Sequence, residues 1–477
     1  MQLIDFLKNE KLPIDGITSD SRQAKKGFLF AALPGSKTNG TEFVGDALMH
    51  GANYILVPSD YKISNEYIDT VHVIHSENTR KDFAKIASKF YKTQPKNIIA
   101  VTGTSGKTST VSFVQQLWHL CGIEDCASLG TLGLRGPKMR KAGKLTTPDT
   151  QSLHAALADL SAVGVDYLAM EASSHGLDQF RLDGVDIQSA AFTNLSHDHL
   201  DYHPDMDSYF EAKARLFSEV MTSKGRTVLN ADDAYFEKLK EICLKNNHEV
   251  ISFGYNGESI KIIERNPMPK GQRLKFSIDE KEYDIILPLV GDFQAMNALC
   301  ALGLVIPYVD DVNVLVSSLE KLRGVPGRLQ LVDGHPKGAV YVDYAHKPAA
   351  LETILTTLRA HTNNKLVCVF GCGGNRDKGK RVMMGDISNR LADIVIVTDD
   401  NPRYENAEDI RSEILSAAPK AKEIGDRAEA IKYAVENLND GDVLVIAGKG
   451  HEEGQIVGEE IFPFNDVTVV KKILEEL

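Results

Sequence analysis

The segment from Asn97 to Gly122 holds the residues whose types and spacing best fit a phosphate-binding site. An apolar run, Ile98 to Val101, precedes the turn GTSGKTS, and apolar residues at helical spacing follow it. Glycines let the backbone amides of such a turn point at phosphate oxygens, while the lysine adds a positive charge and the threonine a magnesium ligand. The match is to the short form GxxGK[ST], since Val101 stands where the longer loop has glycine. The order strand, turn, helix favours phosphate binding over a structural turn.

Further candidate residues follow two other apolar runs. Glu171 ends the run Val165 to Met170, which places a carboxylate at the edge where parallel sheets bind ligands. After the run Ile187 to Phe192, three histidines and two aspartates crowd into the seven residues 197–203, namely His197, Asp198, His199, Asp201 and His203. This density of oxygen and imidazole donors indicates a metal or phosphate neighbour. A polar loop with chance histidines is the alternative.

Lys213 lies inside an apolar stripe. Tyr209 and Phe210 precede it, and Leu216 and Phe217 follow it, each by three or four positions. Burial of an ammonium group is costly and lowers its pKa toward the neutral amine, the form that reacts with carbon dioxide to give a carbamate. Such a carbamate would be an extra acidic metal ligand. Periodicity alone favours the alternative, a lysine whose stem reaches solvent or that pairs with a carboxylate.

Composition excludes several classes of protein. The 477 residues predict about three domains at roughly 150 residues each. A net charge of -12 argues against general nucleic-acid binding, and 43% hydrophobic residues are ordinary for globular proteins. The six cysteines show no zinc-like spacing and predict buried thiols in a reducing compartment. The N-terminus does not resemble a secretion signal, and no apolar stretch approaches the ~18 residues of a membrane span. We therefore expect a cytoplasmic protein.

The residues before the phosphate loop predict a small α/β unit. From Ile17 a turn, a strand over Phe28 to Leu33, a polar loop, a helix and another strand follow one another. The loops are rich in Ser, Thr, Lys and Gly, which suits a polar ligand and suits a solvated surface equally. A charged helix then leads to a boundary near Gln94 to Asn97.

The residues after Arg328 alternate cleanly between strands and helices. Apolar runs at Leu366 to Phe370, Ile394 to Thr398 and Val443 to Ala447 are separated by helical patterns, which is a doubly wound arrangement. Each run is followed by a polar cluster: GCGGNRDKGKR, DDNPR and GKGHEE. Three basic and acidic clusters on one sheet edge indicate a zwitterionic or phosphorylated ligand. A solvated rim is the alternative.

The sequence therefore predicts an α/β protein of three domains. We expect a small N-terminal α/β domain over 1–96, a central P-loop ATPase-like domain over 97–327 and a C-terminal doubly wound, Rossmann-like domain over 328–477.

Ten motifs together carry a family resemblance. They are TGTSGKTST, LTTPD, MEASSHGLDQFRL, TNLSHDHLDYH, YFEAKARLF, VPGRL, VDYAHKP, FGCGGNRDKGKR, DNPR and AGKGHE. Because these motifs occur together and in this order, the chain resembles the Mur ligases over essentially its whole length. The Mur ligases are ATP-dependent amide-forming enzymes of peptidoglycan synthesis. The chain is most similar to the family's UDP-N-acetylmuramoyl-tripeptide synthetases. The resemblance implies that the first domain binds the uridine nucleotide.

The resemblance also implies three binding sites and a magnesium site. ATP would bind Gly103, Thr104, Ser105, Gly106, Lys107, Thr108, Ser109, Asn297, Arg328 and Asp343. UDP-muramoyl-dipeptide would bind Ser19, Ser21, Ser36, Lys37, Thr38, Thr146, Thr147, Ser173, Gln179 and Arg181. The incoming amino acid would bind Arg376, Asp400, Asn401, Pro402, Arg403, Gly448 and Glu452. Mg²⁺ would bind Thr108, Glu171, His199 and a carbamylated Lys213, and the catalytic residues would be Lys107, Glu171, His199 and Lys213.

The DNPR motif bears on the amino acid. Within the family it resembles the enzymes that add meso-diaminopimelate, and Arg403 and Arg376 could bind the carboxylate of the distal stereocentre bidentately. Lysine has no such carboxylate. The alternatives are an L-lysine-adding ligase and a ligase similar to folylpolyglutamate synthetase. The implied reaction passes through an acyl phosphate. We expect small-molecule partners only, with no nucleic acid and no membrane, and a monomer.

Overall fold

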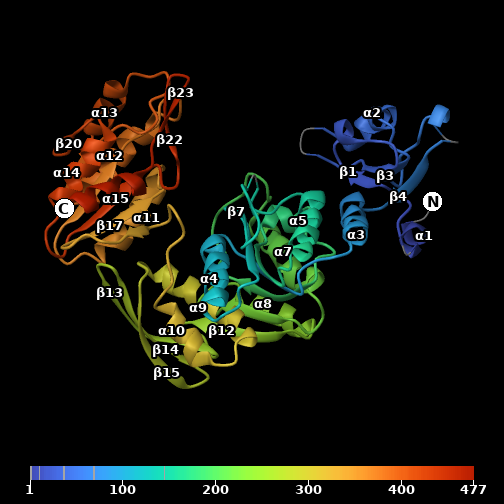
Figure 1. Ribbon diagram of the computed structural model, residues 1–477, viewed down its shortest axis with the longest axis horizontal. Helices are drawn as coiled ribbons and strands as arrows, with labels where there is room; N and C mark the ends of the chain where they lie inside the picture. The colour runs from blue at the N-terminus through green and yellow to red at the C-terminus, as the bar shows by residue number, and fades with distance from the viewer. Residues whose placement is uncertain (1–2, 10, 36–37, 68–69, 144) are drawn as a thin grey trace. The chain divides into compact units, whose positions relative to one another are not determined.

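The computed structural model describes residues 3–9, 11–35, 38–67, 70–143 and 145–477 (Figure 1). The chain divides into two compact units: Met1–Glu258 with Cys300–Asp310, and Ser259–Leu299 with Asp311–Leu477. The fold is the predicted α/β class, with parallel sheets in an N-terminal, a middle and a C-terminal domain. The boundaries expected at 96/97 and 327/328 stay predictions.

The N-terminal domain is a four-stranded parallel sheet with a small core on each face. Its strands run in the order β1 (Gly16–Thr18), β2 (Phe28–Ala31), β3 (Tyr54–Pro58) and β4 (His72–Ser76), and its helices are α1 (Leu3–Lys8), α2 (Val44–Met49) and α3 (Thr79–Tyr91). Because side chains alternate along a strand, Leu29 packs on the face of α1 and α3, whereas Phe30 packs on the face of α2. Both loops predicted to bind ligand follow the carboxyl ends of β1 and β2.

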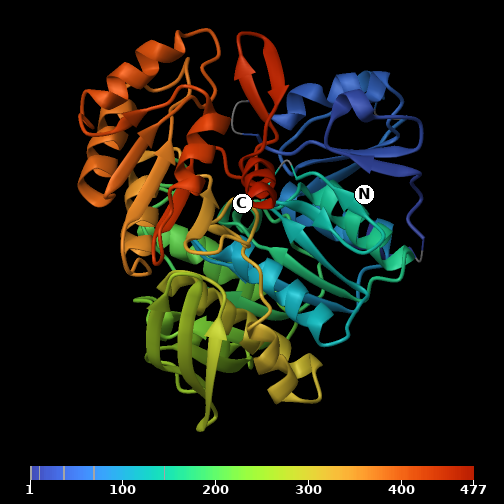
Figure 2. The same cartoon turned by 60° about the vertical axis from the view of Figure 1, so that its left-hand side comes forward.

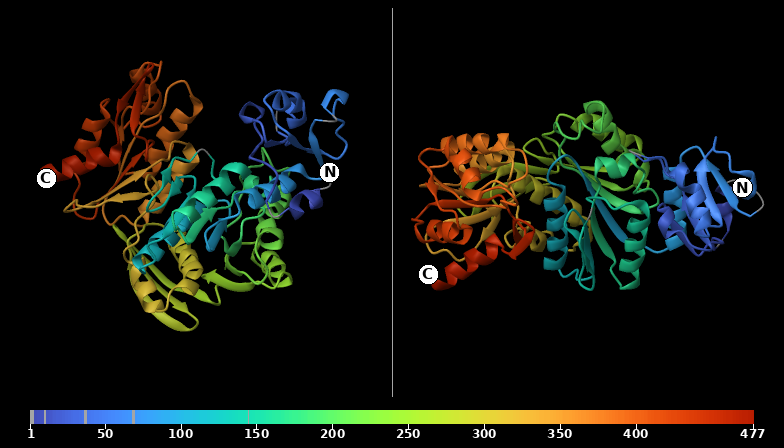
Figure 3. Two further views of the ribbon diagram at one scale, coloured as in Figure 1. Left: turned by 45° about the vertical axis from the view of Figure 1, so that its right-hand side comes forward. Right: turned by 90° about the horizontal axis from the view of Figure 1, so that it is seen from above.

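The central sheet has the phosphate-loop strand near its middle. In the first unit the strand order is β12-β11-β10-β5-β9-β6-β7-β8, parallel from β12 to β6 and antiparallel beyond. The strands are β5 (Asn97–Thr102), β6 (Cys126–Gly130), β7 (Gly133–Arg135), β8 (Arg140–Lys141), β9 (Tyr167–Glu171), β10 (Ile187–Phe192), β11 (Arg226–Asn230) and β12 (Glu249–Gly254). The helices are α4 (Lys107–Leu120), α5 (Thr150–Ala162), α6 (Ser174–Asp178), α7 (Met206–Arg215) and α8 (Phe236–Lys245). Figure 3 shows this part of the chain, coloured cyan to green, in two further views.

The second unit begins with three antiparallel strands, β13 (Ile260–Met268), β14 (Gly271–Ile278) and β15 (Lys281–Leu287). The helices α9 (Asp292–Val305) and α10 (Val312–Leu319) follow in the chain. The C-terminal sheet then runs β16-β17-β21-β18-β19-β20, parallel except for β16. Its strands are β16 (Gln330–Val332), β17 (Ala339–Asp343), β18 (Leu366–Phe370), β19 (Ile394–Val397), β20 (Lys422–Glu423) and β21 (Val443–Ala447).

Helices cover both faces of the C-terminal sheet, as the doubly wound prediction requires (Figure 2). One core gathers side chains from α11 (Pro348–Arg359), α12 (Gly379–Leu391) and α13 (Ala407–Leu415). The other gathers those of α14 (Arg427–Glu436) and α15 (Asp466–Glu476). A hairpin of β22 (Gly454–Val457) and β23 (Glu460–Pro463) precedes α15. The polar ends of β18, β19 and β21 therefore meet at one edge.

Two predictions from composition can be compared with the described residues. Across the ranges given above, the helices are all too short or too polar to cross a membrane. Five of the six cysteines are buried thiols, as predicted: Cys126, Cys243, Cys300, Cys368 and Cys372.

Leu168 tests the packing that positions the phosphate loop. It is fully buried on β9, next to Ile98 of β5, so Leu168→Ala should lower the free energy of unfolding of the first unit by roughly 2–5 kcal/mol. Urea unfolding followed by the fluorescence of Trp118, the single tryptophan, measures this loss. Leu244→Ala is the control, because Leu244 is 56% exposed and should cost less than about 0.5 kcal/mol. Equal losses in the two variants would contradict this packing.

Candidate active site

The phosphate loop joins β5 to α4 and is fixed from the side by the end of β10. The Thr104 N–H donates to Asn194 O at 2.8 Å, and the Thr193 hydroxyl donates to Ser105 O at 2.6 Å. Gly103 has φ +143°, and a Cβ there would lie 2.0 Å from the Thr193 hydroxyl oxygen. Glycine is therefore required at this position, because no other residue fits the space or the backbone conformation.

Lys107 lies folded across its own loop. Its Nζ donates to the carbonyl oxygens of Gly103 and Thr104, both at 2.8 Å. Burial lowers the pKa of Lys107, although the carboxylates of Glu171 and Asp198 oppose that shift. The positive charge predicted for phosphate binding is thus present at the loop.

Glu171 is buried at the end of β9 and is oriented by two threonines. The Thr131 N–H donates to Oε1 at 2.8 Å, and the Thr108 hydroxyl donates to Oε2 at 3.0 Å. Burial raises the pKa of Glu171, and these hydrogen bonds oppose the rise. A carboxylate oxygen beside a threonine hydroxyl suits Mg²⁺, which prefers oxygen ligands. The sequence analysis missed Thr131, although it follows the apolar run at 126–130 just as Glu171 follows its own run.

Lys213 on α7 is buried, with 1% of its surface exposed. Its Nζ donates to Gly103 O at 2.8 Å and lies 4.3 Å from the centre of the Tyr209 ring. Burial and the nearby charge of Lys107 hold the pKa of Lys213 well below its usual range. No carboxylate of a described residue forms an ion pair with it, so the structure favours the buried amine over a lysine that reaches solvent or pairs with an acid.

The histidines of 197–203 gather beside α6 and α7. His199 is exposed, and its ring lies 5.1 Å from that of His175, while the buried His203 packs 5.0 Å from Tyr209. Within the described ranges no three His, Cys, Asp or Glu side chains surround one metal position. The role of His199 as a magnesium ligand therefore stays a prediction.

Four residues predicted to bind the muramoyl-dipeptide form one hydrogen-bonded network next to Glu171. The Thr147 hydroxyl donates to Glu171 O at 2.9 Å and accepts from the Ser173 hydroxyl at 3.1 Å. Arg181 donates to Thr147 O at 2.8 Å and to the Gln179 side chain at 2.6 Å. The structure thus brings these four together.

The other residues predicted for this substrate lie beside that network, in the N-terminal domain or outside the described residues. Thr146 has its hydroxyl 3.1 Å from that of Thr131. In the N-terminal domain, Ser19 and Thr38 are exposed on neighbouring loops and Ser21 is buried. Ser36 and Lys37 lie outside the described residues.

The C-terminal domain has a cavity of about 500 Å³ at the carboxyl edge of its sheet. Six of the seven residues predicted to bind the amino acid line it: Arg376, Asp400, Asn401, Arg403, Gly448 and Glu452. Pro402 is buried and does not line it. The sequence analysis missed five further polar lining residues, Tyr344, His346, Lys347, Asp377 and Lys380, although the first three follow the carboxyl end of β17.

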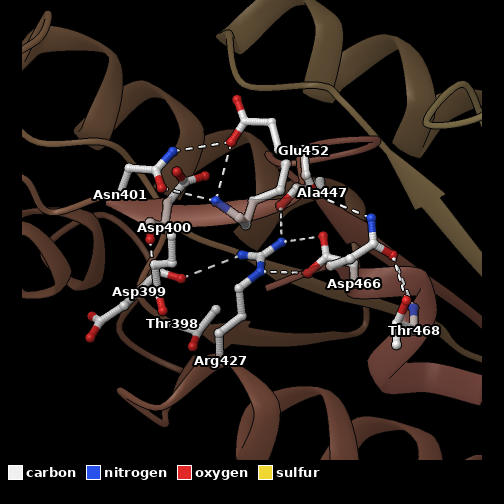
Figure 4. A network of polar contacts seen from close by, with 12 residues as sticks. Thr398, Asp399, Asp400, Asn401, Arg427, Ala447, Glu452, Asp466 and Thr468 are labelled. Carbon is white, nitrogen blue, oxygen red and sulfur yellow. Dashed lines mark hydrogen bonds and ion pairs between the residues drawn. The ribbon is translucent and has the colours of Figure 1, made fainter. Parts of the chain in front are cut away.

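Two of these lining residues are held firmly by the chain. Arg403 has φ +53° and donates from Nη1 to Gly374 O at 2.9 Å. The Asn401 side chain donates to Glu452 Oε2 at 3.1 Å and accepts from the buried Lys449 at 2.9 Å (Figure 4). The cavity thus contains preorganised groups of both signs.

Asp400 lines this cavity, and its carboxyl group is free to bind a ligand. Its carboxylate accepts no hydrogen bond from any residue in the described part of the chain, and it is buried. Burial raises the pKa of Asp400, and the charges of Arg427 and Lys449 oppose this. A buried carboxylate without a donor suits an ammonium group of a ligand.

The remaining residues predicted to bind ATP belong to the second unit. Asp343 is buried and accepts hydrogen bonds from the N–H groups of Leu329 and Ala345, both at 2.7 Å. These bonds fix the loop that carries the exposed Arg328. Asn297 on α9 donates to the side chain of Gln294 at 3.2 Å. Their contribution to ATP binding stays a prediction.

Comparison with known proteins decides the family. The model described as "Mur ligase family, catalytic domain" matches residues 13–92, "Mur ligase middle domain" matches 101–305, and "Mur ligase, glutamate ligase domain" matches 327–450. A relative from Agrobacterium fabrum named UDP-N-acetylmuramoyl-L-alanyl-D-glutamate--2,6-diaminopimelate ligase is 47% identical over 98% of this chain and 94% of its own. The chain belongs to the Mur ligase family. A relative of the same name from Brucella melitensis is 48% identical over 96% of this Mur ligase and 93% of its own length.

Solved structures agree with this assignment. A structure titled as that of a UDP-N-acetylmuramoyl-L-alanyl-D-glutamate--2,6-diaminopimelate ligase has a TM-score of 0.77 and 32% identity, and the match covers 97% of this Mur ligase and 95% of that chain. Mycobacterium tuberculosis folylpolyglutamate synthase complexed with ADP and AMPPCP has a TM-score of 0.56 and 21% identity, over 78% and 92% of the two chains. The second likeness concerns the fold alone.

Gly103 tests the nucleotide-binding loop of this Mur ligase. In Gly103→Ala the new methyl group would clash with Thr193, so we expect ADP to bind roughly tenfold more weakly or worse. Titration with a fluorescent ADP analogue in the presence of Mg²⁺ measures the affinity. Gly45→Ala is the matched control, because a Cβ at Gly45 meets nothing within 4 Å and its affinity should not change. Unchanged ADP affinity in Gly103→Ala would contradict this description of the loop.

Proposed function

We propose that this Mur ligase adds meso-diaminopimelate to UDP-N-acetylmuramoyl-L-alanyl-D-glutamate, with ATP cleaved to ADP and phosphate, in the cytoplasmic synthesis of the peptidoglycan precursor. The substrates are small molecules, and we propose that the enzyme acts as a monomer. The names of the relatives at 47% and 48% identity support the reaction.

The observation that carries the choice of amino acid is the charge pattern of the C-terminal cavity. Arg376 and Arg403 line it together with Asp400 and Glu452. The distal stereocentre of diaminopimelate carries one carboxylate and one ammonium group, so guanidinium groups beside carboxylates match it. Lysine has an ammonium group at its far end and no carboxylate there. If lysine bound in this cavity, the charges of the two arginines would have no partner at its far end, which disfavours lysine as the substrate.

The first chemical step activates a carboxylate. The γ-carboxylate of the D-glutamate residue attacks the γ-phosphorus of ATP, the bond to the β-phosphate oxygen breaks, and an acyl phosphate and ADP result. The backbone of residues 103–109 and the Lys107 ammonium hold the phosphates and balance the charge that moves during transfer. When bound, Mg²⁺ would bring phosphate oxygens together and offset their charge, with Thr108 and Glu171 as the residues that fit it.

The second step forms the amide bond. The free amine of diaminopimelate attacks the activated carbonyl and forms the carbon–nitrogen bond of a tetrahedral intermediate. The bond to phosphate then breaks, the nitrogen loses a proton, and the amide and free phosphate result. Asp400, Asn401, Arg403 and Glu452 would hold the amino acid at its distal end, which leaves the reacting amine free. Positioning therefore accounts for most of what the C-terminal domain contributes.

We further propose that Lys213 acts as a carbamate. Its amine is buried beside Lys107, and burial lowers its pKa, which favours the neutral form that attacks carbon dioxide with loss of one proton. The resulting carboxylate would offset the charge of Lys107 and, with His199, extend the oxygen and nitrogen ligands near Glu171. Thr147, Ser173, Gln179 and Arg181 would hold the dipeptide end of the nucleotide substrate, and the loops after β1 and β2 its uridine end.

Phosphate release tests the reaction. We expect release only when ATP, UDP-muramoyl-dipeptide and an amino acid are all present. Diaminopimelate should exceed L-lysine in kcat/KM by roughly a hundredfold or more, because lysine leaves buried polar groups unpaired. Release that ignores the dipeptide would reject the ligase assignment, and equal use of lysine would reject diaminopimelate specificity.

Lys213→Ala tests the carbamate. We expect kcat to fall roughly a hundredfold or more, and formate or acetate to restore part of it by supplying the missing carboxylate. A ¹³C NMR carbamate signal after addition of ¹³C-bicarbonate should appear in the wild type and be absent from this variant. Lys245→Ala, which removes an exposed lysine, is the control. Unchanged turnover in Lys213→Ala would refute the carbamate role.

A further inference from the structure

Arg427 and Asp466 form a buried ion pair in the C-terminal domain. Arg427 is 1% exposed and Asp466 is 0% exposed. The pair is bidentate: Nε donates to Oδ1 and Nη2 donates to Oδ2, both at 2.8 Å (Figure 4). The cost of removing two charges from water often cancels the attraction between them, so stability is a weak reason for such a pair. We therefore examined what else the guanidinium group binds.

The same guanidinium group ties together two strand ends. Nη2 donates to Ala447 O at 3.0 Å, and Nη1 makes a longer hydrogen bond of 3.5 Å to Asp399 O (Figure 4). Ala447 is the last residue of β21, and Asp399 lies two residues beyond the end of β19. The residues that follow them, Gly448 and Asp400, both line the cavity. The Arg427 side chain thus binds both of the loops that carry Gly448 and Asp400 to the cavity.

The approach of these two loops is close. A Cβ at Gly448, where φ is +115°, would lie 2.7 Å from Asp400 Oδ2. A small shift of either strand end would therefore move the Asp400 carboxylate against the backbone of residue 448. The hydrogen bonds from Arg427 oppose that shift.

Asp466 also determines which acid Arg427 pairs with. Arg427 and Lys449 are the two cations that act electrostatically on Asp400, and both are engaged elsewhere. Lys449 donates to Asn401 at 2.9 Å and to Glu452 at 3.2 Å, while Asp466 accepts two hydrogen bonds from Arg427. Without Asp466, Arg427 would be left with Asp400, an acid that it already attracts and whose carboxylate accepts no hydrogen bond from the described residues. That pairing would neutralise the acid that faces the cavity.

We propose that Arg427 and Asp466 are positioning residues of the amino-acid site: Arg427 fixes the carbonyl groups of Asp399 and Ala447, and Asp466 keeps Arg427 from pairing with Asp400. This role rests on the proposed function, since it assumes that an amino acid with a distal ammonium group occupies the cavity. Neither residue touches the substrate.

Two conservative variants test the proposal. Arg427→Lys keeps the positive charge but cannot form the bidentate contact, and Asp466→Asn keeps the shape of the side chain but loses its negative charge. Initial rates of phosphate release should show KM for the amino acid raised about tenfold in each, because one partner of a buried polar contact is lost. KM for ATP and for UDP-muramoyl-dipeptide should stay within about twofold of the wild type, a split that general destabilisation does not produce. Melting temperatures show that each variant is folded under the assay conditions.

Asp393→Asn is the matched control. Asp393 pairs with Arg359 at 2.7 Å, and Arg359 also donates to the carbonyl of Leu391, so the same types of group meet at the amino end of β19 in a more exposed pair that does not line the cavity. Its KM for the amino acid should not change.

The outcomes separate this inference from the proposed function. The wild type alone shows which amino acid is used, and the ratio of variant to wild-type KM is then measured with that amino acid. Unchanged KM ratios in both variants, or equal rises for all three substrates, would overturn the positioning role. Loss of folded protein in both variants would overturn it too, because the pair would then serve folding alone.

Discussion

Two lysine ammonium groups meet at one carbonyl oxygen, and the chemistry of the first unit depends on that arrangement. Lys107 and Lys213 both donate to Gly103 O at 2.8 Å. Two like charges so close are unfavourable, and burial adds to the cost. The arrangement is stable only if one amine is neutral or if anions enter. Nucleotide phosphates beside Lys107 and a carbamate on Lys213 would each supply the missing negative charge, so substrate binding relieves a cost already present in the fold.

Parallel sheets place the other groups where this chemistry needs them. Glu171 and Thr131 end or follow neighbouring strands of the central sheet, and Asp400 and Gly448 follow two strands of the C-terminal sheet. The shared direction of the strands brings these residues to one edge in each domain. Glycine then permits the closest approaches, as at Gly103. The fold thus positions the functional groups, while a few polar side chains take part in the reaction.

The sequence predicted much of this because its signals were strong at particular residues. Short apolar runs located three strands of the C-terminal sheet, β18, β19 and β21, to within a residue, since buried parallel strands are apolar on both faces. The GxxGK[ST] turn lies between β5 and α4 as predicted, and six of the seven residues predicted to bind the amino acid line one cavity. Periodicity alone ranked Lys213 wrongly as a solvated or paired lysine, because a helical pattern shows which face is buried but not how a long side chain ends. Thr131 was missed because it contributes through its place at a strand end. Tyr344 lies inside the VDYAHKP motif, but the motif alone did not show that its side chain lines the cavity.

The central claim is that the negative charge of nucleotide phosphates, bound together with Mg²⁺, balances the charge of the buried lysines at the loop. A crystal structure with a non-hydrolysable ATP analogue and Mg²⁺ tests it most directly. We predict that Lys107 Nζ leaves the carbonyl oxygens of Gly103 and Thr104 to contact the phosphates, with the cation bound next to Thr108 and Glu171. Lys107 still folded onto its own loop, with the cation away from Glu171, would contradict the account.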